Sequence, residues 1–141
     1  MKMDILISSD KRKLDFGFIH AFLSGESYWA QGRSMEEVRL SIENSICFGA
    51  YLPDGRQIAF ARVITDKVVF AWVMDVFVAP AERGKGVGKL LISEMLKNEV
   101  LQKVKGIGLR TEDAHGLYGM YGFGGIPKAD TWMFRPRQEE I

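Results

Sequence analysis

The feature that most constrains this chain is a set of three alternating glycines, in the stretch Arg83-Gly84-Lys85-Gly86-Val87-Gly88-Lys89. Before it, residues 68–78 are β-rich and apolar except for Asp75, which predicts a central strand buried on both faces. After it, residues 86–98 carry apolar side chains at helical spacing. No Ser, Thr, Asn or Asp stands between Arg83 and Lys89 to cap this helix, so its first backbone N–H groups need another partner.

This stretch, residues 83–89, is called the glycine loop below, and its chemistry predicts an anion site. Glycines let a ligand approach the backbone closely, and the start of a helix favours negative charge. From Arg83 to Arg110 there are seven basic residues against Glu94 and Glu99. A phosphate-bearing ligand accounts for this arrangement, and a glycine-rich turn with a solvated basic rim is the alternative.

Two familiar nucleotide-binding patterns are absent from the glycine loop. Leu90 stands where a phosphate-binding P-loop needs Ser or Thr, and Lys89 stands where the dinucleotide pattern G-x-G-x-x-G needs its last glycine. The phosphate ligand is therefore expected to bind in a different way.

The remaining chain predicts an α/β domain with a mixed sheet and about four helices. Ser34 and Glu37 have the spacing of a capping box, and Asp54-Gly55 between two apolar stretches signals a hairpin. Strands are predicted at 4–8, 46–52, 57–64, 68–78 and 106–110, with a last one around Trp132-Met133-Phe134, and helices at 12–23, 35–44, 86–98 and 114–121. No linker or repeat divides the chain, which predicts a single domain over residues 1–141.

Composition excludes several classes of function. The 141 residues carry a net charge of +1, whereas a protein that coats nucleic acid has a large basic excess. The single cysteine, Cys47, cannot form an internal disulfide. No apolar run reaches transmembrane length, and the start lacks the apolar stretch of a signal peptide, so a cytoplasmic protein is expected, with no membrane partner.

Two segments together resemble the GCN5-related N-acetyltransferase (GNAT) superfamily. Arg83, Gly86 and Gly88, preceded by Val76-Phe77-Val78, match the coenzyme motif Arg/Gln-x-x-Gly-x-Gly/Ala. Residues 114–123, read as Ala-His-Gly-Leu-Tyr-Gly-Met-Tyr-Gly-Phe, are similar to the family segment Ala-x-x-Leu-Tyr-x-x-x-Gly-Phe with one register difference, and resemble a subgroup of small bacterial members. Thr111 stands where the family often has Asn.

The resemblance implies an N-acetyltransferase that moves an acetyl group directly from acetyl-CoA to a primary amine of a small molecule or peptide, without a metal. It places the pyrophosphate on the glycine loop and the pantetheine arm along the strand near a bulge at residues 75–78. The residues that it assigns to the coenzyme are Val76, Phe77, Val78, Arg83, Gly84, Lys85, Gly86, Val87, Gly88, Lys89 and Thr111.

Two residues are candidates for the chemistry. Tyr118 matches the family tyrosine beside the departing sulfur, where its hydroxyl acts as a general acid or as a hydrogen-bond donor to the thiolate. Asp75 is the first candidate for the base that deprotonates the amine, since burial raises the pKa of a carboxyl group. Pairing of Asp75 with Arg62 or Arg110, and a water-mediated route without a dedicated base, are the alternatives.

The remaining candidates lie outside these motifs. Tyr28 and Trp29 are assigned to the acceptor site, because the loop between the first two helices commonly walls it in the family. The aromatic residues near Trp132 could serve a homodimer interface. Cys47 is expected to be a buried small apolar residue and His20 a half-buried packing residue, and His115 stands beside the coenzyme motif. A non-catalytic acyl-CoA-binding regulator is the competing function, and a nucleic-acid module is disfavoured by the charge.

Overall fold

The computed structural model describes residues 4–138, which form two compact units. The first unit runs to Arg110 and the second begins at Thr111. The helices of the first unit are α1 (Phe16–Gly25), α2 (Met35–Glu43), α3 (Val87–Leu96) and α4 (Glu99–Lys103), with 3-10 helices at Lys11–Lys13 and Pro80–Glu82. The second unit contains α5 (His115–Gly119) and a 3-10 helix at Ala129–Thr131.

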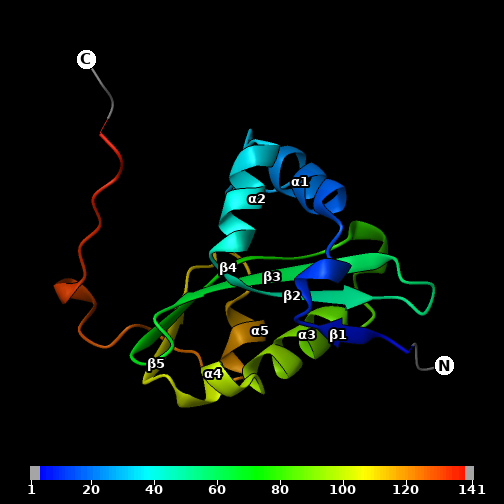
Figure 1. Ribbon diagram of the computed structural model, residues 1–141. Coiled ribbons are helices and arrows are strands. Elements are labelled where there is room, and N and C mark those ends of the chain that lie inside the picture. The colour runs from blue at the N-terminus through cyan, green and yellow to red at the C-terminus, as the bar shows by residue number, and fades with distance from the viewer. Residues whose placement is uncertain (1–3, 139–141) are drawn as a thin grey trace. The chain divides into compact units, whose positions relative to one another are not determined.

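The first unit is built on one five-stranded sheet in the order β1-β2-β3-β4-β5 (Figure 1). Its strands are β1 (Leu6–Ser8), β2 (Ile46–Tyr51), β3 (Gln57–Thr65), β4 (Phe70–Val78) and β5 (Gly106–Leu109). The first four pair antiparallel in sequence, and β5 pairs parallel to β4 after the connection through α3 and α4. The predicted α/β class with a mixed sheet is confirmed, with five α-helices in the described residues.

Helices cover both faces of this sheet. Figure 1 shows α1 and α2 above the sheet and α3 below it. Side chains from α1 and α2 pack with Cys47, Phe60 and Phe77 of three neighbouring strands. Phe77 stacks on Phe22 of α1 with ring centroids 4.0 Å apart. Because α1 and α2 are held to the sheet through Phe77, the loop between them lies near the carboxyl end of β4.

Local side-chain chemistry sets the ends of the helices and turns. The capping box of α2 is confirmed, since Ser34 Oγ accepts from Glu37 N and Glu37 Oε1 accepts from Ser34 N. Between β2 and β3 the predicted hairpin turn is closed by Leu52 N donating to Arg56 O at 2.9 Å, with Gly55 at φ 91°. At that φ a glycine avoids the strain of a β-carbon.

The first helix starts later than predicted, because two aspartates cap separate segments. Asp15 is the N-cap of α1 and accepts from Phe18 N, so α1 begins at Phe16 rather than at residue 12. Residues 11–13 form a 3-10 helix of their own, capped by Asp10. Leu14 between them is extended, with ψ 134°.

Two other expectations were wrong. Burial alternates along β4: Ala71, Val73, Asp75 and Phe77 are buried and the residues between them are half-buried, so the strand is fully buried along neither face. The last strand around Trp132 is absent, because residues 132–138 have no strand pairing in the described part of the chain. An apolar sequence forms a strand only where a neighbour pairs with its backbone groups, and Met133 is 96% exposed.

Candidate functional site

The glycine loop leads from the 3-10 helix Pro80–Glu82, which follows β4, into α3, and two of its glycines have a left-handed backbone conformation. Gly84 and Gly86 have φ of 79° and 83°, values that side-chain-bearing residues adopt only under strain. Gly86 is the N-cap of α3 and supplies no side-chain hydrogen bond. The first turn of α3 is therefore uncapped by side chains, as predicted, and its N–H groups point toward the loop.

The three glycines differ in what a side chain would meet. A β-carbon at Gly84 or Gly86 has no atom within 4 Å, so both backbones border open space. A β-carbon at Gly88 comes to 3.7 Å from Val78 Cγ2, which is ordinary contact. Glycine is thus required for backbone conformation at positions 84 and 86. At position 88, neither the backbone conformation nor the surrounding space requires glycine.

The cations of the glycine loop are partly engaged within the first unit. Arg83 Nε donates to Val78 O at 3.2 Å, and its guanidinium lies 5.9 Å from the ring centroid of Phe22. Lys85 pairs with the buried Glu82 at 3.3 Å. Glu82 lies just before the stretch in which the basic excess was counted, so the net positive charge at the loop is smaller than that count indicates.

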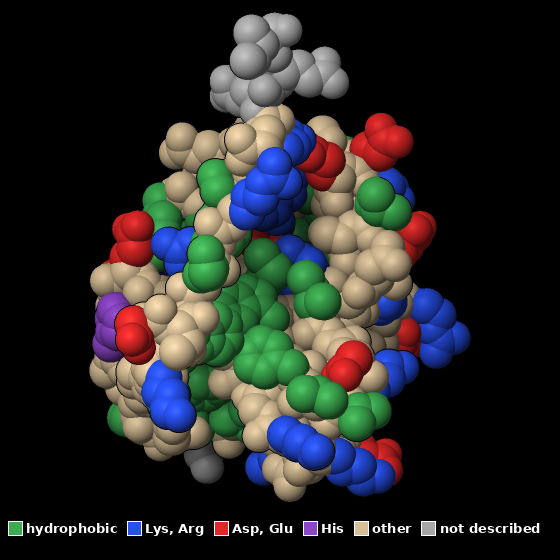
Figure 2. Space-filling model, turned by 90° about the vertical axis from the view of Figure 1, so that its left-hand side faces the viewer, with side chains coloured by type: hydrophobic (Ala, Val, Ile, Leu, Met, Phe, Trp, Pro, Cys, Tyr) green, Lys and Arg blue, Asp and Glu red, His purple; other side chains and the backbone are tan. Residues whose placement is uncertain are grey.

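More widely, the surface carries both signs of charge. Lys97 pairs with Glu94 and Lys103 with Glu99. Figure 2 shows basic and acidic side chains interspersed around the rim of one face, with hydrophobic side chains between them. Two of the basic residues after the glycine loop are therefore paired with neighbouring carboxylates.

A bulge interrupts β4 where the family resemblance implies one. Phe77 pairs with Phe60 and Met74 with Arg62 of β3, so two residues of β4, Asp75 and Val76, lie opposite one residue of β3. Asp75 has φ 54°, an uncommon value for a residue with a side chain. At the bulge the Asp75 side chain points toward the interior of the first unit, and Asp75 is 5% exposed.

The pairing between β4 and β5 ends short of the bulge. It runs from Phe70 and Gly106 to Val73 and Leu109, where β5 ends. The edge of β4 over residues 74–78 therefore continues past its parallel neighbour, and Val78 O on this stretch accepts from Arg83. Backbone groups along such an edge can pair with an extended ligand, as they would with another strand.

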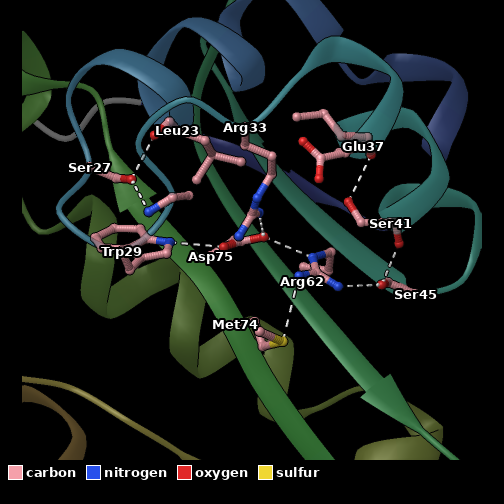
Figure 3. A network of polar contacts seen from close by, with 12 residues as sticks. Leu23, Ser27, Trp29, Arg33, Glu37, Ser41, Ser45, Arg62, Met74 and Asp75 are labelled. Carbon is pink, nitrogen blue, oxygen red and sulfur yellow. Dashed lines mark hydrogen bonds and ion pairs between the residues drawn. The ribbon is translucent and has the colours of Figure 1, made fainter. Parts of the chain in front are cut away.

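Asp75 is the centre of a buried set of polar contacts (Figure 3). Its Oδ2 accepts from Arg33 Nη1 at 2.6 Å and from Arg62 Nε at 2.9 Å, and its Oδ1 accepts from Trp29 Nε1 at 2.8 Å. Arg62 also donates through Nη1 to Ser45 Oγ at 3.1 Å. These five residues are called the Asp75 cluster below.

The pKa of Asp75 is lowered, which corrects the expectation that burial would raise it. Burial alone disfavours the carboxylate, but the charges of Arg62 and Arg33 and their hydrogen bonds outweigh that effect. The predicted pairing with Arg62 is confirmed. The second ion pair of Asp75, with Arg33, was not predicted from the sequence, because no residue near Arg33 in the chain indicates it.

Tyr28 and Trp29 lie in the loop between α1 and α2, as predicted. Trp29 is tied to the bulge through Asp75, and its ring lies edge-on to Tyr28 at 5.0 Å between centroids. Trp29 is 39% exposed and Tyr28 is 51% exposed. Together they present an aromatic surface next to the buried carboxylate.

The predicted residues of the second unit lie on and around α5. Tyr118 is buried, and its ring packs edge-on against Phe123 at 5.9 Å between centroids. Thr111 Oγ1 accepts from Ala114 N at 3.0 Å, which orders the turn before the helix. His115 is exposed at the start of α5, and Tyr121 is half-buried.

Cys47 is buried and His20 is half-buried. Cys47 is 1% exposed, and burial raises the pKa of its thiol to about 11, which keeps it protonated and poorly nucleophilic. His20 is half-buried on α1. Within the described residues no group of His, Cys, Asp and Glu could hold a metal ion, and no helix is long and apolar enough to cross a membrane.

Comparison with known proteins decides the family. The sequence model of the acetyltransferase (GNAT) domain matches residues 43–124, a stretch that includes β2 to β5, the glycine loop and α5. The chain belongs to the GNAT acetyltransferase family. A crystal structure of a GNAT-family protein from Xanthomonas campestris pv. campestris is 40% identical, covers 97% of this chain and 96% of its own, and superposes with a TM-score of 0.93.

Two curated relatives are named as acetyltransferases. The chloroplastic serotonin N-acetyltransferase 2 of Oryza sativa subsp. japonica is 33% identical over 116 residues, which are 76% of this chain and 57% of the rice protein. A Gibberella zeae protein, provisionally named an acetyltransferase, is 28% identical over 137 residues, which are 82% of this chain and 76% of its own. Acetyl transfer from acetyl-CoA is the activity of this GNAT family, so the chain is an acetyltransferase.

The glycine loop of this GNAT protein fits the coenzyme. The open backbone at Gly84 and Gly86 and the uncapped start of α3 offer N–H donors to phosphate oxygens. The β4 edge beyond its last pair with β5 offers backbone groups to an extended arm. The first unit thus brings together the glycine loop, residues 76–78, Asp75 and Trp29.

Proposed function

We propose that this protein transfers the acetyl group of acetyl-CoA directly to a primary amine of a small molecule or peptide. One observation carries the proposal: α3 begins at a left-handed glycine without a side-chain cap, and it is the next α-helix after a bulged strand whose edge extends beyond its parallel neighbour. An anion site and a backbone edge in sequence suit a ligand with phosphates at one end and an extended arm at the other.

The coenzyme supplies an acetyl thioester. The N–H groups of residues 87–89 bind its pyrophosphate, with Gly84 and Gly86 allowing close approach and Arg83, Lys85 and Lys89 supplying positive charge. The backbone of residues 76–78 pairs with the pantetheine arm, and a freed N–H at the bulge polarises the thioester carbonyl. The Thr111 hydroxyl, which already accepts from Ala114 N, has a proton left to donate to the arm.

In the reaction, the amine nitrogen forms a bond to the acetyl carbon, the carbon–sulfur bond breaks, and the amine loses a proton. The departing thiolate takes a hydrogen bond or a proton from Tyr118. A free thiol has a pKa of about 8.5 and a phenol of about 10, so complete proton transfer from the phenol to the thiolate is unfavourable. A hydrogen bond from the Tyr118 hydroxyl stabilises the thiolate without that transfer. Tyr118 is the catalytic residue in this proposal.

The general-base role of Asp75 stays a prediction, and its geometry favours a different one. A carboxylate that accepts from three donors and has a lowered pKa is a weak proton acceptor. We therefore assign Asp75 to positioning Trp29 and the two arginines, with water carrying the proton away from the amine. Trp29 and Tyr28 form the wall of the acceptor site.

The wider setting is proposed on the same basis. Residues 1–141 act as a single GNAT domain in the cytoplasm, without nucleic acid or membrane as a partner. The exposed apolar run Trp132-Met133-Phe134 is the proposed homodimer contact. Gel filtration of the wild type and of a Trp132→Ser/Phe134→Ser variant tests it, and an unchanged elution volume contradicts it.

Two measurements test the proposed function. Acetyl-CoA is expected to raise the melting temperature, because a ligand that binds the native state stabilises it, whereas ATP and NAD shift it little. Release of free CoA thiol, followed with a panel of amines, then reports turnover. A shift with ATP and none with acetyl-CoA contradicts the coenzyme site. A shift with acetyl-CoA but no thiol release with any amine favours the non-catalytic acyl-CoA-binding regulator.

A further inference from the structure

The strand β5 forms one edge of the sheet in the first unit (Figure 1). Among the described residues it pairs with β4 and with no other strand. About half of the backbone N–H and C=O groups of an edge strand point away from its neighbour and can pair with a further strand. All four residues of β5 are half-buried, and its sequence, Gly-Ile-Gly-Leu, contains neither the proline nor the charged residue that protects many edges. This edge therefore suits the addition of a strand.

One face of β5 is made of glycine, and two rings of β4 lie over it. The register pairs Phe70 with Gly106. It also pairs Trp72 with Gly108, and paired residues lie on the same face of a sheet. A β-carbon at Gly108 would come within 2.8 Å of Trp72 Cζ3 and 2.9 Å of Phe70 Cζ. Both rings are half-buried, so aromatic side chains of an added strand could pack against them and cover the glycines.

A short segment of the second unit has the properties of such a strand. Residues 132–135, Trp-Met-Phe-Arg, match the four residues of β5 in length and end before Pro136, which cannot donate to a sheet. Trp132 already has extended backbone, with φ −88° and ψ 135°. Met133 is 96% exposed and Phe134 is 83% exposed, and the segment belongs to no strand in the part of the chain that the structure describes. Its aromatic residues stand at alternate positions, as on one face of a strand.

We infer that residues 132–135 of a second copy of this chain pair as a strand with the outer edge of β5, and that the two copies exchange these segments reciprocally. The aromatic residues of the segment then lie over the β5 glycines, beside the rings of β4. Met133 lies on the opposite face with Ile107. The inference rests on the homodimer contact proposed above, and it specifies the surface that this contact covers and the backbone pairing that holds it.

The area of this exchange is the area that a stable dimer needs. An aromatic side chain buries about 150–250 Å², so the exposed parts of Trp132, Met133 and Phe134 together offer about 400 Å². Each copy gives one segment and covers another, so the two exchanges bury roughly 1,600 Å² in total, the usual size of a specific interface. A second copy supplies one edge and one segment to match the first, which closes the assembly as a symmetric dimer.

Disulfide cross-linking tests the pairing directly, because the single native cysteine, Cys47, is buried. Met133→Cys is co-expressed with Ile107→Cys or with Leu109→Cys, and one chain carries a tag that changes its size. Opposed residues of paired strands have α-carbons about 4.5–5.5 Å apart, which a disulfide can span. A mixed disulfide-linked dimer should therefore form with at least one β5 variant. Leu6→Cys, 51% exposed at the opposite edge of the sheet, is the control and should not cross-link with Met133→Cys.

Sedimentation of the wild type separates this inference from the proposals on which it depends. If the wild type is a dimer but Met133→Cys cross-links with neither β5 variant, or equally with Leu6→Cys, the strand pairing is wrong and the homodimer contact stands. A disulfide only within one chain, in Met133→Cys/Ile107→Cys, also overturns the inference, because the segment then pairs with its own β5. A monomeric wild type contradicts the inference and the homodimer contact together. Turnover with an amine tests acetyl transfer independently of all these results.

Discussion

Two regions flank the end of β4, and one consists of backbone groups whereas the other consists of side chains. The glycine loop is backbone: two left-handed glycines, an uncapped helix start and open space around both. The Asp75 cluster is side chains: a carboxylate, two guanidiniums, an indole and a hydroxyl joined by short contacts and mostly buried. The loop is thus prepared for a ligand that covers it, whereas the cluster is already largely satisfied within the protein.

Because of this difference, we expect folding stability to depend on the Asp75 cluster and ligand binding to depend on the glycine loop. Removing a member of a buried charged cluster leaves other charges without partners, so the penalty falls on folding. Changing an open glycine alters a surface that nothing in the first unit contacts, so most of the penalty falls on the ligand.

The largest effect is expected for Asp75→Asn. The amide keeps the shape of the side chain and tolerates the left-handed backbone, but it leaves Arg33 and Arg62 without their counter-charge. The free energy of unfolding should fall by about 3 kcal/mol or more. Urea denaturation measures it, with Asp54→Asn in the exposed β2–β3 turn as the control, expected within about 0.5 kcal/mol of wild type. Similar losses in both variants would show that the cluster is not a stability centre.

The comparison also implies that the chemistry depends on a residue outside both regions. Tyr118→Phe keeps the ring and its packing against Phe123 and removes only the hydroxyl. Turnover should fall roughly tenfold to a thousandfold with little change in coenzyme affinity. An acyl donor with a more acidic thiol should narrow the difference. Tyr121→Phe is the matched control and should be nearly silent; if the two variants have the same turnover, the role given to Tyr118 is wrong.

Smaller effects should separate two glycines of the same loop. Gly86→Ala forces a side chain to adopt φ 83° and is expected to lower the free energy of unfolding by about 1–2 kcal/mol. Gly88→Ala lies inside α3 with room for a methyl group, and should leave stability unchanged or raise it by about 0.5–1 kcal/mol. A β-carbon at Gly86 enters the open space where the pyrophosphate is proposed to approach, whereas one at Gly88 lies against Val78, so calorimetric affinity for acetyl-CoA should fall in Gly86→Ala and change little in Gly88→Ala. Unchanged affinity in a folded Gly86→Ala variant would place the anion site elsewhere.

The smallest effect is a difference in pH dependence. Because the folded-state pKa of Asp75 lies below its unfolded value of about 3.9, its carboxylate contributes stability above that pH and loses it as pH falls through the folded pKa. Urea midpoints of the wild type should therefore drop more steeply below about pH 4 than those of Asp75→Asn. Parallel curves for the two proteins would contradict the lowered pKa.

The same contrast explains what sequence reasoning could predict. The capping box at Ser34 and Glu37, the hairpin at Gly55 and the uncapped start of α3 are local, so neighbouring residues specify them. The bulge at Asp75 followed from the family resemblance, and the register confirms it.

What the sequence could not predict depends on distant partners. Arg33 and Trp29 reach Asp75 across 42 and 46 residues, and nothing in the residues around Arg33 indicates that contact. The raised pKa expected for Asp75 followed from burial alone and was wrong because two guanidiniums were left out. The strand predicted at Trp132 failed for the related reason that an apolar pattern does not supply a pairing partner.

Calorimetric titration with acetyl-CoA and with S-acetylpantetheine, which has the same thioester and arm but no pyrophosphate, tests the central claim most directly. If the uncapped start of α3 binds the pyrophosphate, acetyl-CoA should bind the wild type at least about a hundredfold more tightly. Equal affinities for the two ligands would contradict the account, because the glycine loop would then contribute nothing to coenzyme binding.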